Sequence, residues 1–220
     1  MLNMIRMDWA AMKYYKKRVL VVFICLLIMG FVSPIYLVPG AVLISFAFSL
    51  NPFAVEEQGD LSRLYLTLPV KRNQVVAGRY ALSLIMVSCG ILLGFLFMPI
   101  ANRISFSKWY PSLEWILAIA AFCILFYALM NIFMYPLLFK LGYHKGKFWG
   151  MYMPLGVFAM AYAIFLAYNQ IPGNEKLIFN MLVYASEHML LVSGGMLALA
   201  AVLLTVSYRL SLKAYLKREF

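Results

Sequence analysis

Charged residues are scarce in this 220-residue sequence: 12% are Asp, Glu, Lys or Arg, whereas 65% are hydrophobic. Soluble domains contain roughly 25% charged and 45–50% apolar residues. The shortage of charge therefore excludes a soluble domain. Short segments of alternating polarity, which are typical of a membrane β-barrel, are also lacking. The remaining class is an all-α, polytopic membrane protein whose single domain spans residues 1–220.

Cysteine and histidine are equally sparse, which argues against metal and hydrolytic chemistry. The three cysteines lie in apolar runs without CxxC spacing and predict no disulfide framework or zinc site. His144 and His188 have no ligand partner at helical spacing. Glu56-Glu57 followed by Arg63 lacks the spacing and the histidines of intramembrane diglutamate proteases. We expect no metal site, no cofactor bound by this chain, and no enzyme activity.

An ATP site of its own is also missing. The nearest match to a phosphate-binding loop is Gly142-Tyr-His-Lys-Gly146-Lys147-Phe148. Its glycines stand too close together, and Phe148 occupies the position at which Ser or Thr must hold magnesium. Ion-coupled carriers usually carry a charge inside a span, and the apolar runs here contain almost none. Energy is therefore expected to come from a partner.

Six apolar runs are long enough to predict six transmembrane helices, because a spanning helix needs about 20 apolar residues. The first run, Val19 to Val55, is too long for one helix and is broken at Ser33-Pro34 and Pro39-Gly40. We therefore predict a hairpin there. The predicted spans are residues 19–36, 39–55, 81–101, 115–139, 148–168 and 188–208.

The basic residues divide unevenly between the two sides of these spans. Sixteen lie in the N-terminus, the 51–80 and 140–147 loops and the C-terminus, and three lie on the other side, namely Arg103, Lys108 and Lys176. Cytoplasmic loops of membrane proteins carry the excess of Lys and Arg. We predict a multi-pass protein of the plasma membrane with both termini cytoplasmic. The net charge of +11 lies between apolar runs rather than on one basic face, so nucleic acid is not expected as a partner.

Two segments that do not span the membrane have helical spacing. Residues 1–18 predict an amphipathic interfacial helix, in which Met4, Met7, Ala11 and Tyr14 recur at three- and four-residue steps. A plain basic flank of the first span is the alternative. Residues 169–187 predict a short external helical element before the last span.

Polar residues inside the spans are few and uncharged. They provide four candidates for a translocation path: Tyr127, Asn131, Tyr135 and Tyr162. The first three share one helix face, and hydrogen bonding between helices is the alternative function for them. Gly90 and Gly94, at GxxxG spacing, predict close helix packing.

The longest polar interruption predicts a docking surface for a cytoplasmic partner over residues 56–80. Glu56, Glu57 and Asp60 precede a short apolar stripe that Pro69 ends. The stripe consists of Leu61, Leu64, Tyr65 and Leu68. Acidic residues favour a helix N-terminus, so we predict a short coupling helix parallel to the membrane. The alternative is an interfacial helix that rests on lipid.

The sequence Tyr65-Leu-Thr-Leu-Pro69-Val-Lys-Arg72, continued to Gly78-Arg79-Tyr80, resembles a known motif. It is similar to the Leu-Pro-(Val/Ile)-x-Arg…(Lys/Arg)-Tyr pattern of permease subunits in the ATP-binding-cassette type-2 exporter family. The small standalone permeases, which include exporters of amphipathic peptides, are the most similar. The predicted layout of the whole chain resembles this family as well.

This resemblance implies a transmembrane permease subunit of an ATP-driven exporter for hydrophobic or amphipathic substrates such as peptides. It implies a second permease subunit, either a copy or a paralogue, and separate ATP-binding subunits that hold ATP–Mg. Membrane lipids are the remaining partner. By position, the resemblance assigns ATPase coupling to Glu56, Glu57, Asp60, Leu61, Arg63, Leu64, Leu68, Pro69 and Arg72. A self-contained secondary transporter or channel is the alternative.

Overall fold

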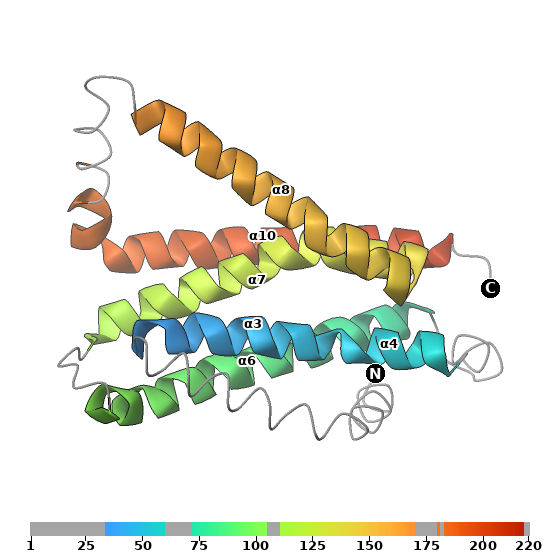
Figure 1. Ribbon diagram of the computed structural model, residues 1–220, viewed down its shortest axis with the longest axis horizontal. Coiled ribbons are helices and arrows are strands. Elements are labelled where there is room, and N and C mark those ends of the chain that lie inside the picture. Colours follow the sequence, from blue (N-terminus) through green and yellow to red (C-terminus); the bar gives the residue numbers. More distant parts are fainter. Residues whose placement is uncertain (1–33, 60–71, 105–110, 170–179, 181–182, 218–220) are drawn as a thin grey trace.

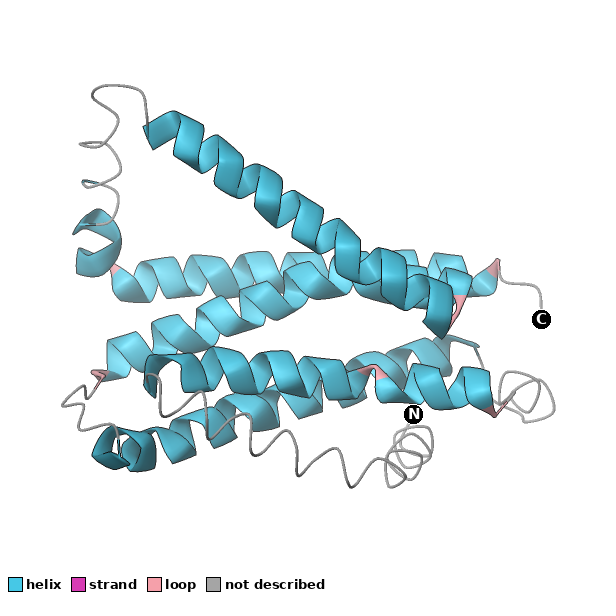
Figure 2. Ribbon diagram, viewed as in Figure 1, coloured by secondary structure: helices cyan, strands magenta, loops and turns pink. Residues whose placement is uncertain are grey.

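Helices are the only regular structure in the described parts of the chain (Figures 1 and 2). The computed structural model describes residues 34–59, 72–104, 111–169, 180 and 183–217. The all-α class is confirmed. The predicted interfacial helix at residues 1–18, most of the first arm of the hairpin and the apolar stripe at residues 61–68 lie outside the described residues.

The second arm of the predicted hairpin is longer than the sequence indicated. It comprises a 3-10 turn, η2 (Pro34–Tyr36), followed by α3 (Leu37–Ser49) and α4 (Asn51–Gln58). Pro39 and Gly40 fall inside the first turn of α3 and do not break it. A proline is tolerated there because the N–H groups of a first turn have no partner within the helix. Pro52 likewise falls in the first turn of α4.

The remaining long helices coincide with the other predicted spans. They are α6 (Arg72–Ile104), α7 (Leu113–Leu141), α8 (Tyr143–Asn169) and α10 (Met189–Leu216). Among the described residues, Pro34–Gln58, Arg72–Arg103, Leu113–Leu141 and Met189–Leu216 are long and apolar enough to cross a membrane. The count of six spans stays a prediction. Before α10, residues 183–187 are helical, which fits the predicted external element in part.

α6 begins at Arg72, well before the predicted start near Ala81. Its early turns carry Val75, Val76 and Tyr80, and all three side chains are buried. The helix therefore continues through a polar sequence because one of its faces packs inside the protein.

Glycines allow α3 and α6 to approach closely. A Cβ atom on Gly90 would lie 2.3 Å from Ser45 Oγ, and one on Gly94 would lie 2.8 Å from Val38 Cα. The predicted packing role of this GxxxG pair is confirmed. Such contacts matter in a bilayer because lipid tails are as apolar as the helices. Close packing, and not the hydrophobic effect, therefore drives the association of the helices.

A single residue, Gly142, connects α7 to α8. Its φ of 82° lies in the left-handed region that favours glycine, and its N–H donates to Leu138 O at 3.1 Å. A Cβ on Gly146 would lie 2.9 Å from both Leu137 O and Leu138 Cα. The two glycines that faintly resembled a phosphate loop thus build a tight helical hairpin.

The helices form two parts of different character (Figure 1). We call α3, α4, α6, α7 and α10 the bundle body, in which α3 packs on α6, and α7 packs on α10. α8 contacts α7 and the end of α4, and then diverges from α10 along its length. A Cβ on Gly156 of α8 would meet no atom within 4 Å, in contrast to Gly90 and Gly94 of α6.

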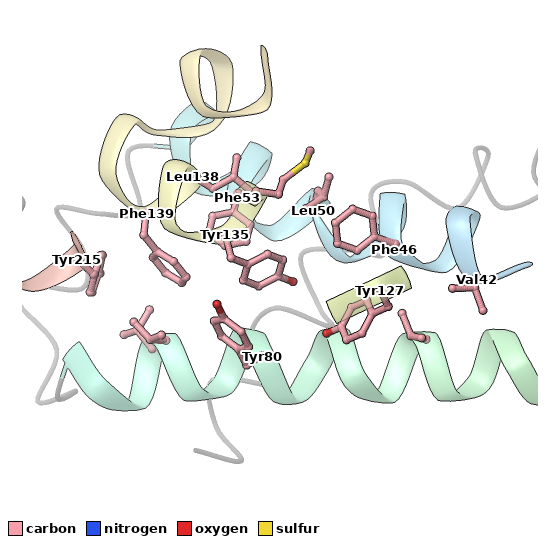
Figure 3. Packing of buried hydrophobic residues seen from close by; sticks show 14 of the residues in the cluster. Val42, Phe46, Leu50, Phe53, Tyr80, Tyr127, Tyr135, Leu138, Phe139 and Tyr215 are labelled. Carbon is pink, nitrogen blue, oxygen red and sulfur yellow. The ribbon is translucent and has the colours of Figure 1, made fainter. Parts of the chain in front are cut away.

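Aromatic rings form much of the core of the bundle body (Figure 3). The Phe53 centroid lies 5.4 Å from that of Tyr135 and 5.0 Å from that of Phe139. Tyr80 lies 4.7 Å from Tyr135, and Phe139 lies 5.4 Å from Tyr215. These edge-on pairs join α4, α6, α7 and α10 at one end of the bundle, where each is worth about 0.5–1.5 kcal/mol beyond its buried area.

Candidate functional site

We call residues 60–71, which connect α4 to α6, the predicted coupling segment. The helix ends on either side of it meet at one end of the bundle. The end of α4, the start of α6, the α7–α8 turn and the end of α10 all lie there (Figure 1). We call this the basic end, because most of the basic residues in the described helices lie there: Arg72, Arg79, Lys140, Lys145, Lys147, Arg209, Lys213 and Lys217. The described parts of the segments that the charge tally assigned to one side of the membrane therefore share one end of the fold.

A buried ion pair joins α4 to α6 at this end. Arg79 Nη2 lies 2.5 Å from Glu56 Oε2, and the two side chains are 2% and 8% exposed. The Arg79 guanidinium also covers the Phe53 ring, with its carbon 4.1 Å from the ring centroid. Charges removed from water are costly unless they are paired. The pair therefore fixes the two stems of the coupling segment against each other.

Glu57, the next residue, contacts α8 instead. Its Oε2 accepts hydrogen bonds from the backbone N–H of Tyr143 and, at 3.1 Å, from that of His144. These are amides of the first turn of α8, which have no carbonyl partner within the helix. A carboxylate there also stabilises the positive end of the helix dipole. Glu57 thus attaches the end of α4 to the start of α8.

Arg72 provides a third attachment. Its Nη1 donates to Leu216 O at 3.0 Å. This carbonyl belongs to the last turn of α10, where cations are favoured by the helix dipole and by unpaired carbonyl groups. Glu57 and Arg72, the residues on either side of the predicted coupling segment, are therefore attached to α8 and α10, respectively.

Tyr80 extends the contact with α10 into the bundle. Its hydroxyl lies 2.6 Å from Ser207 Oγ and 2.8 Å from Ser211 Oγ, and all three residues are buried. The motif noted in the sequence ends with Gly78-Arg79-Tyr80. Of these residues, Arg79 contacts α4 and Tyr80 contacts α10.

Three of the four path candidates belong to a buried hydrogen-bond network. The Tyr127 hydroxyl donates to Ser83 Oγ at 2.8 Å, and Ser83 donates to Ser49 Oγ at 3.1 Å. Tyr135 lies 3.4 Å from the same Ser49 oxygen. Asn131 presents its backbone oxygen to Ser207 at 3.0 Å. This is the hydrogen bonding between helices that the sequence left open, and it links α3, α6, α7 and α10.

The fourth candidate, Tyr162, lies apart from the other three. It is on α8, and 63% of its surface is exposed. The structure thus brings Tyr127, Asn131 and Tyr135 together in the interior and places Tyr162 on the face of a different helix. The role of these four residues in a translocation path stays a prediction.

The coupling candidates are described only in part. Glu56, Glu57 and Arg72 form the contacts above, while Asp60, Leu61, Arg63, Leu64, Leu68 and Pro69 lie outside the described residues. Glu56 and Glu57 end helix α4 rather than standing in a loop before the coupling helix. Their coupling role stays a prediction.

Sequence reasoning did not include Arg79 and Tyr80 among the site residues. One clue was available: Arg79 and Glu56 are opposite charges placed at the ends of two facing apolar runs. A charge at that depth needs a partner of opposite sign.

Comparison with known protein families gives a match over nearly the whole chain. A family model described as "ABC-2 family transporter protein" matches residues 3–216. No curated protein and no solved structure matches the chain.

Proposed function

Because the chain belongs to the ABC-2 family of transporter proteins, and is a membrane permease of that type, we propose that it serves an ATP-driven exporter. Its substrates are hydrophobic or amphipathic molecules, such as amphipathic peptides. It has no ATPase site of its own and binds no cofactor. ATP–Mg is held by separate cytoplasmic ATP-binding subunits, and a second permease subunit, identical or paralogous, completes the path across the plasma membrane.

The observation that carries this proposal is the set of attachments at the basic end. The ion pair of Glu56 with Arg79 joins the end of α4 to the start of α6, the two helix ends between which residues 60–71 lie. Glu57 and Arg72 extend this connection to α8 and α10. A displacement of the 60–71 segment by an ATPase would therefore reach both helices directly.

The substrate class is supported by the surface of α8. Its exposed side chains include large apolar and aromatic ones, such as Met160 at 65%, Tyr162 at 63% and Leu166 at 45%. These side chains belong to the half of α8 that follows Gly156, and this half in contact with a second permease subunit would form a path suited to apolar molecules. We keep Tyr127, Asn131 and Tyr135 as candidate path residues that become accessible only when the helices move.

The test is a co-purification in mild detergent combined with ATP-dependent substrate export. Leu64→Asp places a charge in the apolar stripe and should abolish both recovery of the ATPase and export. Leu141→Asp makes the same change at the α7–α8 turn, where Leu141 is 39% exposed, and should preserve both. Membrane insertion of both variants is checked by their yield in washed membranes.

Two results would contradict the proposal. Export that persists after the ATPase has been removed would favour a self-contained carrier or channel. Equal loss with Leu64→Asp and Leu141→Asp would remove the assignment of docking to the 60–71 segment.

A further inference from the structure

One face of α8 combines a basic, an aromatic and a small-residue section in that order. Lys145, Trp149, Tyr152 and Gly156 recur at three- and four-residue steps, so they lie on the same side of the helix. All four are exposed. Phe148 borders the same side and is 58% exposed. We call these five residues the α8 stripe.

The α8 stripe does not face the rest of the protein. The side of α8 that packs on α7 is marked by Gly146 and Gly150, where added Cβ atoms would lie 2.9 Å from Leu138 Cα and 3.1 Å from Met134 Cγ. These glycines lie one residue beyond Lys145 and Trp149, about 100° around the helix. The α8 stripe therefore lies on a side of α8 that does not pack on α7.

Its order matches the layers of one membrane leaflet. Lys145 lies in the first turn of α8, at the basic end of the bundle, which corresponds to headgroup level when α8 spans the membrane as the sequence predicts. The aromatic rings follow, as in the aromatic belt at a membrane interface. The ring centroids of Phe148 and Tyr152 lie 4.5 Å apart. Deeper in the bilayer comes Gly156, around which an added Cβ would meet nothing within 4 Å.

We propose that the α8 stripe is a binding site for an acidic phospholipid. The Lys145 ammonium binds the lipid phosphate, the rings of Trp149 and Tyr152 lie beside its glycerol region, and an acyl chain lies over Gly156. Charge complementarity selects the lipid, because an anionic headgroup gains from a lysine near the surface and a zwitterionic one gains little. This site is independent of which substrate the permease moves.

Lys147 provides a matched control within the same turn. Its Nζ lies 5.4 Å from the Tyr143 ring centroid, in a cation–π contact within α8. It is two residues from Lys145 and therefore points to the other side of the helix. Lys145→Gln and Lys147→Gln remove the same charge, but only the first removes it from the α8 stripe.

The experiment reads the fluorescence of Trp149 in full-length protein in nanodiscs. Trp9, Trp109 and Trp115 are replaced by Phe, so that the emission reports the α8 stripe alone. The discs contain phosphatidylcholine with a small fraction of brominated phosphatidylglycerol, or the same fraction of brominated phosphatidylcholine. Bromine quenches tryptophan on contact. Circular dichroism and size-exclusion chromatography check that each variant is folded.

The proposal predicts about fivefold stronger quenching by the brominated acidic lipid, the ratio expected when one lysine contributes about 1 kcal/mol. Lys145→Gln should bring the ratio close to one, and Lys147→Gln should leave it unchanged. Raising the salt to 1 M should also lower the ratio, because screening then acts within about 3 Å.

Three results would overturn the site. Equal quenching by both lipids in the unaltered stripe would make it an ordinary lipid-facing surface. An absence of quenching by either lipid would mean that protein, such as a second permease subunit, covers it. Equal loss of preference with Lys145→Gln and Lys147→Gln would replace a site with diffuse attraction of the basic end.

Discussion

The bundle body and α8 differ in how they are held. Inside the bundle body, buried hydroxyl groups, an ion pair and close glycine contacts connect every helix to at least one helix distant in sequence. α8 is attached near its start, through Gly142, its contact with α7 and the Glu57 carboxylate. In a bilayer, polar and close-packed contacts decide which helices stay together. The comparison therefore separates a part that should move as one unit from a helix whose outer faces are open to lipid or protein.

Removal of one partner of the buried ion pair should have the largest effect. Arg79→Met leaves the Glu56 carboxylate buried without its cation, which costs about 3–5 kcal/mol. Thermal unfolding in detergent measures the loss. Combining Arg79→Met with Glu56→Gln should cost less than the sum of the two single changes.

Arg103 serves as the control for this change. It is an exposed arginine at the other end of α6, and Arg103→Met should leave the unfolding temperature nearly unchanged. If Arg79→Met were equally mild, the ion pair would not hold the bundle body together.

The next largest effect is expected from adding one methyl group, which should destabilise the bundle body but not α8. Gly94→Ala places a Cβ 2.8 Å from Val38 Cα, so the α3–α6 contact must open, at a cost of about 1–3 kcal/mol. Gly156→Ala meets no atom and should be neutral, or stabilising by up to about 1 kcal/mol through helix propensity. Unfolding midpoints of the two variants give the comparison directly. Equal midpoints would show that α8 is as tightly packed as the bundle body.

Deleting one hydroxyl should have a smaller effect. Tyr80→Phe removes the hydrogen bonds to Ser207 and Ser211 and should cost about 0.6–1.7 kcal/mol, the range for such bonds between membrane helices. Tyr162→Phe, on the exposed face of α8, should cost nothing measurable. Reversible unfolding by a denaturing detergent provides both values. A cost for Tyr162→Phe that equals the cost for Tyr80→Phe would contradict the distinction.

The smallest effect is expected at the attachment of α8 itself. Glu57→Gln removes the charge but not the acceptor oxygen, so only about 0.3–1 kcal/mol of local stability should be lost. Hydrogen–deuterium exchange should accelerate at the amides of Tyr143 and His144, while the bundle body stays unchanged. Glu114→Gln, in the first turn of α7, is the matched control and should not alter exchange in α8. Unchanged exchange after Glu57→Gln would show that the cap does not hold α8.

Most of the fold follows from hydropathy, because a spanning helix must satisfy its backbone within one apolar run. The positions of α6, α7, α8 and α10 and the close packing at Gly90 and Gly94 were predictable in this way. The break predicted at Pro39-Gly40 was wrong because a proline in a first turn removes no needed hydrogen bond. The early start of α6 was missed because only the core reveals that Val75 and Val76 are buried.

The site was less predictable than the fold. Glu56 and Glu57 were recognised as special, but adjacent carboxylates look alike in a sequence. Only the structure shows that one is paired with Arg79 and the other accepts from the α8 backbone. Likewise, helical spacing placed Tyr127, Asn131 and Tyr135 on one face without showing whether that face met water or a neighbouring helix. Partners distant in sequence decide such questions.

The bonds from Tyr80 to Ser207 and Ser211 also impose an order on biogenesis. A ribosome that adds about 5–20 residues per second needs roughly 6–25 s to proceed from Tyr80 to Ser207. Throughout that interval, the Tyr80 hydroxyl on α6 lacks its partners from α10, and the Asn131 carbonyl on α7, once it has been synthesised, lacks the Ser207 hydroxyl. Among the described helices, α10 thus completes the interior that the earlier helices leave open, and a nascent chain that stalls before it presents unpaired polar groups that membrane quality control can detect.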